Sequence, residues 1–125
     1  MIVLDSSALL AVLLGERGAE RVAAALADAV ISTASLAEIL SKVQQRGIDS
    51  ESAFLAVSTL GIGILPVEEV HARIAAQISR APRDLDLSLG DRLCIALAIE
   101  LDAELLTSDR GVARFKAGIP ITLFC

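Results

Sequence analysis

Aromatic, cysteine and histidine residues are scarce in this chain, and their scarcity excludes several kinds of site. Of the 125 residues, three are phenylalanine and none is tyrosine or tryptophan, so Ala, Leu, Ile and Val must build the core. The two cysteines, Cys94 and Cys125, lack zinc-type spacing, and we interpret them as free thiols of a reducing cytoplasm. The one histidine, His71, is expected to be exposed or half-buried on a helix, because no triad or metal-ligand spacing surrounds it. A glycine-rich phosphate loop is also absent.

Long apolar runs are absent as well. The longest, residues 8–15 (ALLAVLLG), is far shorter than the ~20 residues that span a bilayer. No basic segment precedes the first apolar stretch, which Asp5 interrupts, so neither a membrane span nor a signal peptide is expected. The composition is nevertheless 54% hydrophobic, with a mean hydropathy of +0.67. Such a surplus of apolar surface predicts a buried contact with another chain.

Positive charge is also in short supply. The chain has 11 Lys and Arg against 16 Asp and Glu, a net charge of −5, and an isoelectric point near 4.7. This balance argues against a general nucleic-acid-binding surface, which is normally basic. An acidic protein can still act on phosphates if a bound cation supplies positive charge locally.

Short strand patterns alternate with helical patterns along the chain. The alternation predicts an α/β fold around a mainly parallel sheet, and the length predicts one domain over residues 1–125. Pro66 indicates an edge strand or a strand end. The predicted strands are residues 2–5, 29–32, 63–67, 103–107 and 120–124. The predicted helices are residues 6–15, 18–28, 35–47, 49–61, 68–81 and 88–102, with a short one at 110–115.

Four acidic residues occupy equivalent places in this pattern. Asp5 ends the first strand, and Asp109 follows the fourth. Glu38 and Asp91 are expected in the first turns of helices that follow the second strand and the polar segment before residue 88. In a parallel sheet, ligand sites form beyond the carboxyl ends of the strands. The fold would therefore bring all four acids to one edge of the sheet.

Each acid taken alone can also be explained as a helix cap. The spacing S-x-x-E at residues 35–38 and S-x-x-D at residues 88–91 fits a capping box, in which the acid answers a serine at the helix start. Asp5 could cap the helix after it, and Ser108 and Asp109 could cap the last helix. One such cap is worth about 1 kcal/mol.

If all four acidic side chains lie close together, the consequence differs from that of four separate helix caps. Two carboxylates about 4 Å apart repel by up to ~4 kcal/mol at an effective dielectric of 20, and four acids make about six such pairs. Caps have no reason to converge, whereas a cluster of oxygen ligands selects Mg²⁺ or Mn²⁺. A cation held there can activate a water and stabilise charge on a phosphodiester. The four acids together therefore predict a divalent-cation site.

The motifs around these acids resemble those of PIN-domain ribonucleases, and most closely the small VapC-type toxins of toxin–antitoxin pairs. The likeness runs from the first strand to the last. It rests on four motifs in order, IVLDSSALLA, SLAEIL, SLGDRLCIALA and LLTSDRGVARF. The resemblance implies a three-layer α/β/α fold, metal-dependent cleavage of RNA, self-association as a homodimer, and inhibition by a cognate antitoxin.

Carried over by position, the resemblance assigns roles to individual residues. It implies that the acids are the catalytic, metal-binding quartet, and that Ser7 and Thr107 support them by orienting carboxylates or water. Two positions depart from the family pattern: Ser35 stands where many members carry Asn, and Arg92 where a small residue is common. Arg92 could pair with its neighbour, contact RNA or face water, and Arg110 is a second possible RNA contact. The quartet is Asp5, Glu38, Asp91 and Asp109.

These observations lead to one hypothesis and two alternatives. We expect a Mg²⁺- or Mn²⁺-dependent endoribonuclease that acts as a toxin and is neutralised by its antitoxin. The first alternative is a catalytically inactive PIN-like module that acts through protein contacts, which would suit the apolar surplus. The second is a metal-dependent phosphatase acting on small phosphate esters.

Overall fold

The computed structural model describes all 125 residues and contains one five-stranded sheet whose pairings are all parallel. The strands are β1 (Ile2–Leu4), β2 (Ala29–Ser32), β3 (Gly63–Leu65), β4 (Glu104–Thr107) and β5 (Ile121–Leu123). The helices are α1 (Ser6–Leu14), α2 (Ala19–Ala23), α3 (Thr33–Gln45), α4 (Ser50–Ser58), α5 (Glu69–Ile78), α6 (Leu89–Leu101) and α7 (Arg110–Arg114), with 3₁₀ turns η1 (Leu26–Asp28) and η2 (Arg83–Leu85). The predicted α/β class and all five predicted strands are confirmed.

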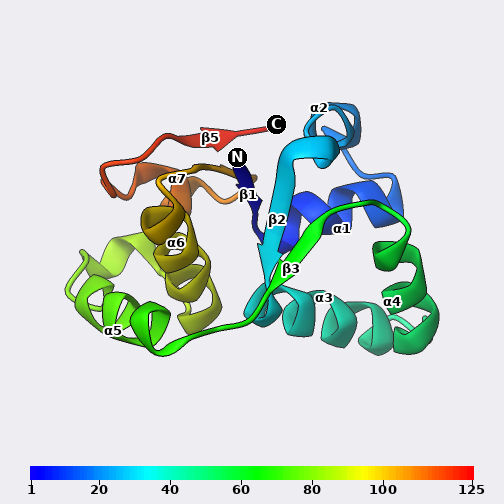
Figure 1. Cartoon of the computed structure of the whole chain (residues 1–125), viewed down its shortest axis with the longest axis horizontal. Helices are drawn as coiled ribbons and strands as arrows, with labels where there is room; N and C mark the ends of the chain where they lie inside the picture. Colours follow the sequence, from blue (N-terminus) through cyan, green and yellow to red (C-terminus); the bar gives the residue numbers. More distant parts are fainter.

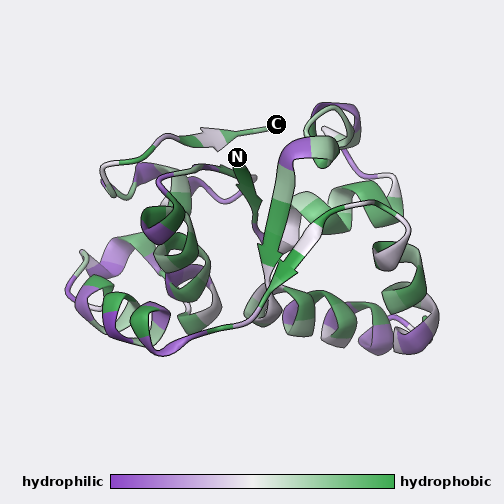
Figure 2. Cartoon of the chain, viewed as in Figure 1, coloured by the Kyte–Doolittle hydropathy of each residue, from purple (hydrophilic) through white to green (hydrophobic).

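Helices cover both faces of the sheet, so the fold has three layers, as expected. Helices α1 to α4 lie on one side and α5, α6 and α7 on the other (Figure 1). Adjacent residues of the central strands point to opposite faces, because side chains alternate along a strand. Leu4 and Leu106 pack with the first group of helices, and Val3 and Leu105 with the second. Figure 2 shows β1 and most of β2 in the hydrophobic colour and the helices in mixed colours.

The strand order is β3-β2-β1-β4-β5. The chain adds β2 and β3 on one side of β1, then crosses to the other side to add β4 and β5. The carboxyl ends of β1 and β4 therefore flank the point where the order of strand addition reverses, which is where ligands bind in open α/β sheets. Pro66 follows β3, an edge strand, as its position predicted.

Helix α3 begins two residues earlier than predicted. The extended backbone of β2 ends at Ser32, whose hydroxyl accepts from Ala34 N at 3.0 Å and caps the helix directly. The capping box expected at residues 35–38 is therefore wrong. Ser35 already lies inside the first turn, where its buried hydroxyl has no hydrogen-bond partner. Glu38 consequently lies in the second turn and caps nothing.

Two other expectations are corrected. The predicted helix over residues 18–28 is instead divided into α2 and η1. In this Ala-rich stretch after Gly18, Val22 is the only buried residue, so packing stabilises only a short helix. His71 is buried, 2% exposed, where an exposed or half-buried side chain was expected. As for membranes, every helix falls short of the length and apolar character that a crossing requires.

Candidate functional site

Asp5 lies directly after β1 at the carboxyl edge of the sheet and is 6% exposed. Its Oδ1 accepts from Ser7 Oγ at 2.6 Å and from Ala8 N at 3.0 Å, so it caps α1. Its Oδ2 accepts from Thr107 Oγ1 at 2.5 Å. Both carboxylate oxygens are thus held in fixed directions by groups from α1 and β4.

Ser7 and Thr107 also join Asp5 to the turn that carries Asp109. The Ser7 hydroxyl accepts from Ser108 N at 3.0 Å, and the Thr107 hydroxyl accepts from Asp109 N at 2.9 Å. Asp109 is the N-cap of α7, because its Oδ1 accepts from a first-turn amide at 3.0 Å. The hydroxyls that sequence motifs singled out therefore connect two of the four acids.

Asp91 and Glu38 meet at the start of α6. Asp91 and Ser88 form the predicted capping box, with Asp91 Oδ2 accepting from Ser88 N at 2.9 Å and Ser88 Oγ accepting from Asp91 N at 3.1 Å. The Glu38 carboxylate, reaching from α3, lies against Gly90. A β-carbon placed on Gly90 would come within 2.7 Å of Glu38 Cδ. Only a glycine at this position lets the carboxylate approach so closely.

The charges of three of these acids, Asp5, Glu38 and Asp91, act on one another. Burial raises the pKa of Asp5 above its ordinary value of 3.8, although its hydrogen bonds oppose the shift, and the charge of Asp91 adds to it. Burial also raises the pKa of Glu38, with further contributions from Asp91 and Asp5, while Lys42 lowers it. Beneath them, burial raises the pKa of the Cys94 thiol well above its usual range, which fits its predicted place in the core.

No basic side chain forms an ion pair with these acids, since the protein's ion pairs all lie elsewhere. In the present rotamers, however, no three His, Cys, Asp or Glu side chains are close enough together to hold one ion. The helix caps use only one oxygen each of Asp91 and Asp109, and neither Glu38 oxygen accepts a hydrogen bond. Unpaired, mutually repelling carboxylates with free oxygens fit a hard divalent cation in chemistry. Their role as metal ligands stays a prediction.

The two arginines expected near substrate lie in different surroundings. Arg110 is the first residue of α7 and is exposed beside Asp109. Arg92 does not pair with Asp91. Its Nη1 donates instead to Ala75 O at 3.1 Å, near the end of α5.

Sequence reasoning missed Gly90. A signal was present, because glycine in a helix is about 1 kcal/mol less favourable than alanine, and a glycine in the first turn of a helix therefore calls for a reason. The structure supplies the reason in the approach of Glu38.

Comparison of the sequence with known families gives one match. The model of the PIN domain matches residues 2–118, nearly the whole chain. No curated protein matches the sequence.

Several solved structures share the fold. One is FitAcB from Neisseria gonorrhoeae, with 26% identity, a TM-score of 0.71, and coverage of 97% of this chain and 96% of that chain. Another is a toxin–antitoxin complex from Klebsiella pneumoniae, with 18% identity, a TM-score of 0.74 and 94% coverage of both chains. A third is DNA-bound VapBC from Salmonella typhimurium, with 19% identity, a TM-score of 0.73, and coverage of 99% and 98%. The family match, which spans both layers of helices and four of the five strands, shows that this chain belongs to the PIN-domain family.

Proposed function

We propose that the protein is a Mg²⁺- or Mn²⁺-dependent endoribonuclease and the toxin of a toxin–antitoxin pair. The observation that carries the proposal is the placement of Asp5, Glu38 and Asp91 so that their charges act on one another, with Asp109 joined to Asp5 through Thr107. Membership of the PIN family supports it, as does the likeness to structures described as toxin–antitoxin complexes. A chain that acted only by binding would gain nothing from keeping these charges together.

The chain's own residues divide the work of hydrolysis. Asp5, Glu38, Asp91 and Asp109 would hold the cation, which when bound supplies positive charge and Lewis acidity for attack on the phosphodiester. Ser7 and Thr107 keep the Asp5 carboxylate in one orientation. Glu38, whose oxygens accept no hydrogen bond and whose pKa is raised, is the acid best suited to take the proton released by the attacking water.

The proposal is tested by measuring cleavage of RNA by the purified protein with Mg²⁺ or Mn²⁺. Asp5→Asn and Asp91→Asn should abolish cleavage while leaving the circular-dichroism spectrum unchanged. Asp49→Asn is the matched control, because Asp49 also caps a helix, α4, but outside the acidic group. Undiminished cleavage by the first two variants contradicts the assignment. Turnover of a phosphate monoester without RNA cleavage would favour the phosphatase, and inactivity in both assays the binding module.

We further propose that the protein self-associates and is bound by an antitoxin in the cytoplasm. Large apolar side chains remain exposed at Ile48, Phe54 and Leu55, around α4, and Leu55 is 64% exposed. Exposed apolar residues grouped in this way support contact with another chain. Sedimentation velocity should show a dimer, and a monomer across the micromolar range would contradict it. Co-expression with the cognate antitoxin should suppress RNA cleavage.

A further inference from the structure

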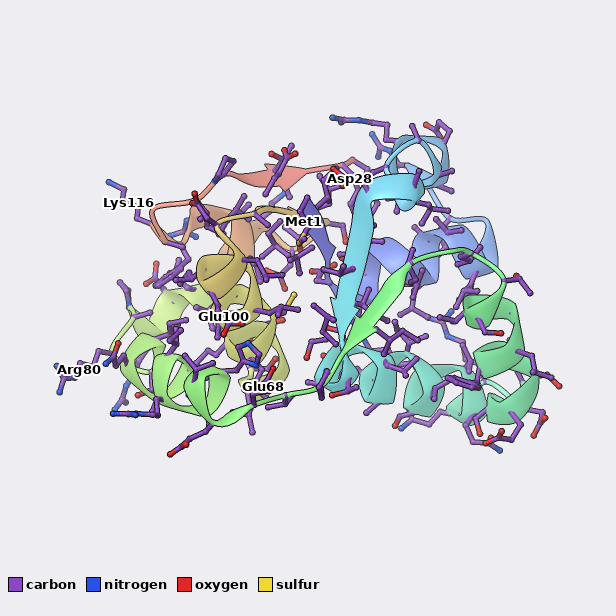
Figure 3. The ribbon with its side chains drawn as sticks, viewed as in Figure 1. Met1, Asp28, Glu68, Arg80, Glu100 and Lys116 are labelled. Atoms are coloured by element: carbon purple, nitrogen blue, oxygen red, sulfur yellow. The ribbon has the colours of Figure 1, made fainter.

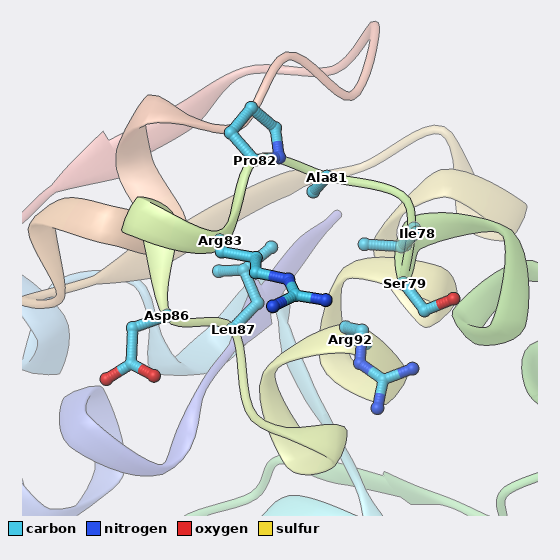
Figure 4. A pocket seen from close by; sticks show the side chains of 8 residues that line it. All are labelled: Ile78, Ser79, Ala81, Pro82, Arg83, Asp86, Leu87 and Arg92. Carbon is cyan, nitrogen blue, oxygen red and sulfur yellow. The ribbon is translucent and has the colours of Figure 1, made fainter.

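A hollow of about 360 Å³ borders the start of α6, the helix that carries Asp91, and contains two arginines without ion-pair partners. It is formed by the end of α5, the segment before α6 and the first turn of α6 (Figure 4). Ile78 and Leu87 supply apolar wall, and Arg83 and Arg92 supply the positive charge. Most arginines of this chain form no ion pair, but only these two line the same hollow.

The two guanidinium groups are placed to receive an anion. The bond from Arg92 Nη1 to Ala75 O fixes this group at the wall and leaves its other N–H groups free. The Arg83 side chain makes no hydrogen bond and no ion pair, whereas the nearby Arg114 is paired with Asp84 at 2.9 Å. Figure 4 shows both guanidinium groups on one side of the hollow and the carboxylate of Asp86, its only acid, on the other.

The hollow and the acids share the start of α6. Arg92 follows Asp91 directly, and Leu87 precedes Ser88, the N-cap of the helix. A strand of RNA whose phosphodiester lay at the acids would therefore extend past this hollow. Guanidinium groups bind phosphate through two parallel hydrogen bonds, which makes arginine the preferred residue for such a contact.

We propose that Arg83 and Arg92 bind a phosphate group of the RNA that flanks the cleaved bond. The inference rests on the proposed function and deepens it by naming a substrate-positioning site. A cation at the acids neutralises only the phosphate at the cleaved bond. The adjacent phosphates of the RNA strand therefore require positive charge from the protein itself. The hollow supplies that charge next to the acids.

A purely structural role for these arginines makes a different prediction. The bond to Ala75 O helps to end α5, so losing Arg92 could destabilise the helix without affecting RNA. Arg83 has no such bond, and Arg92→Lys keeps both a donor and the charge. Arg80→Ala is the matched control, because Arg80 is exposed at the same end of α5, lies outside the hollow and projects away from the molecule (Figure 3).

The test combines cleavage kinetics with NMR of the arginine Nε–Hε groups, using a short single-stranded RNA of mixed sequence. Arg83→Ala should raise KM about tenfold with kcat nearly unchanged, because a contact made equally in substrate and transition state is lost. The salt dependence of log KM should fall by about 0.7, the value for one phosphate contact to a single strand. Arg92→Lys should raise KM by a smaller factor, and Arg80→Ala should leave it within about twofold. RNA without metal, and at higher concentration inorganic phosphate, should shift the Arg83 and Arg92 signals.

The outcomes separate this inference from the proposed function. Suppose that the wild-type protein cleaves RNA, that Arg83→Ala leaves KM unchanged, and that the Arg83 and Arg92 NMR signals do not shift. The inferred phosphate site is then contradicted, while the proposed nuclease function is supported. If RNA and phosphate shift these signals but no RNA is cleaved, the proposed nuclease function is contradicted and the inferred anion site is supported. Neither cleavage nor shifts would overturn both.

Discussion

At Asp5, burial and hydrogen bonding act in opposite directions on one carboxylate. Burial is the larger effect and raises the pKa, while bonds from Ser7, Thr107 and the Ala8 amide favour the anion. The same bonds orient both oxygens, so the folded protein holds a well-positioned but poorly solvated charge. Such a charge is stabilised when a cation approaches it.

Asp5→Asn should make the metal-free protein less sensitive to pH. Because the pKa of Asp5 in the folded protein lies above 3.8, the folded protein binds a proton at Asp5 more tightly than the unfolded chain does. The free energy of unfolding therefore falls as the pH rises from 3.8 to the raised pKa of the folded protein. Asparagine stays neutral, so urea unfolding in EDTA should show the variant as stable as wild type or more at pH 8, with a smaller difference at pH 5. A variant weaker than wild type by the same amount at both pH values would contradict this.

Gly90→Ala should reduce activity without destabilising the fold. Alanine is favoured over glycine in a helix by about 1 kcal/mol, but its β-carbon would displace the Glu38 carboxylate. Displacement of an active-site carboxylate should lower kcat/KM by roughly 10- to 100-fold. The control is the double variant with Glu38→Ala, in which Gly90→Ala should have no additional effect on activity. A further loss in that background would show that Gly90 acts by another route.

At the scale of elements, periodicity predicted nearly every helix and strand, because each packs one face against the sheet. The boundaries that failed depended on information outside the local pattern. Two serines, Ser32 and Ser35, could each cap α3, and the correctly predicted end of β2 at Ser32 did not decide between them, because a helix can follow a strand directly or after a short turn. His71 was misjudged for a related reason, since its partner Glu100 is 29 residues away on α6.

His71 should stabilise the packing of α5 against α6. Its Nδ1 accepts from Glu68 N at 2.9 Å, and its Nε2 lies 2.7 Å from Glu100 Oε1; Figure 3 labels both glutamates. His71→Phe removes both bonds in a buried place and should lower the free energy of unfolding by about 2 kcal/mol, measured with urea. Glu100→Gln keeps an acceptor oxygen and should cost less. Equal losses in the two variants would point to the ionic charge as the main contribution.

At the scale of the whole molecule, topology determines which distant residues share an edge. The sequence alone predicted the four acids as a set, because strands of a parallel sheet end at a common edge. The hollow with Arg83 and Arg92 was not predictable in this way, since the irregular segment before α6 has no periodic pattern that would place it. Arg92 could be singled out by its place beside Asp91, but its turn towards α5 depends on helix packing.

The acids come from both layers of helices, and this makes metal binding a test of the whole fold. Glu38 belongs to α3 on one face and Asp91 to α6 on the other, while Asp5 and Asp109 follow the central strands. A cation held by all four would connect both layers, so Mg²⁺ or Mn²⁺ should raise the stability of the protein as one cooperative transition. The gain is about 2.7 kcal/mol at a concentration 100 times the Kd.

Differential scanning calorimetry with and without the cation measures this gain, and EDTA should reverse it. The double variant Asp5→Asn with Asp91→Asn should lose it, because two ligands and their charges are gone, while Asp49→Asn should keep it. A rise in the melting temperature that persists in the double variant would place the cation elsewhere. Two separate transitions, only one of them sensitive to the metal, would mean that the ion is held by one layer and not shared across the sheet.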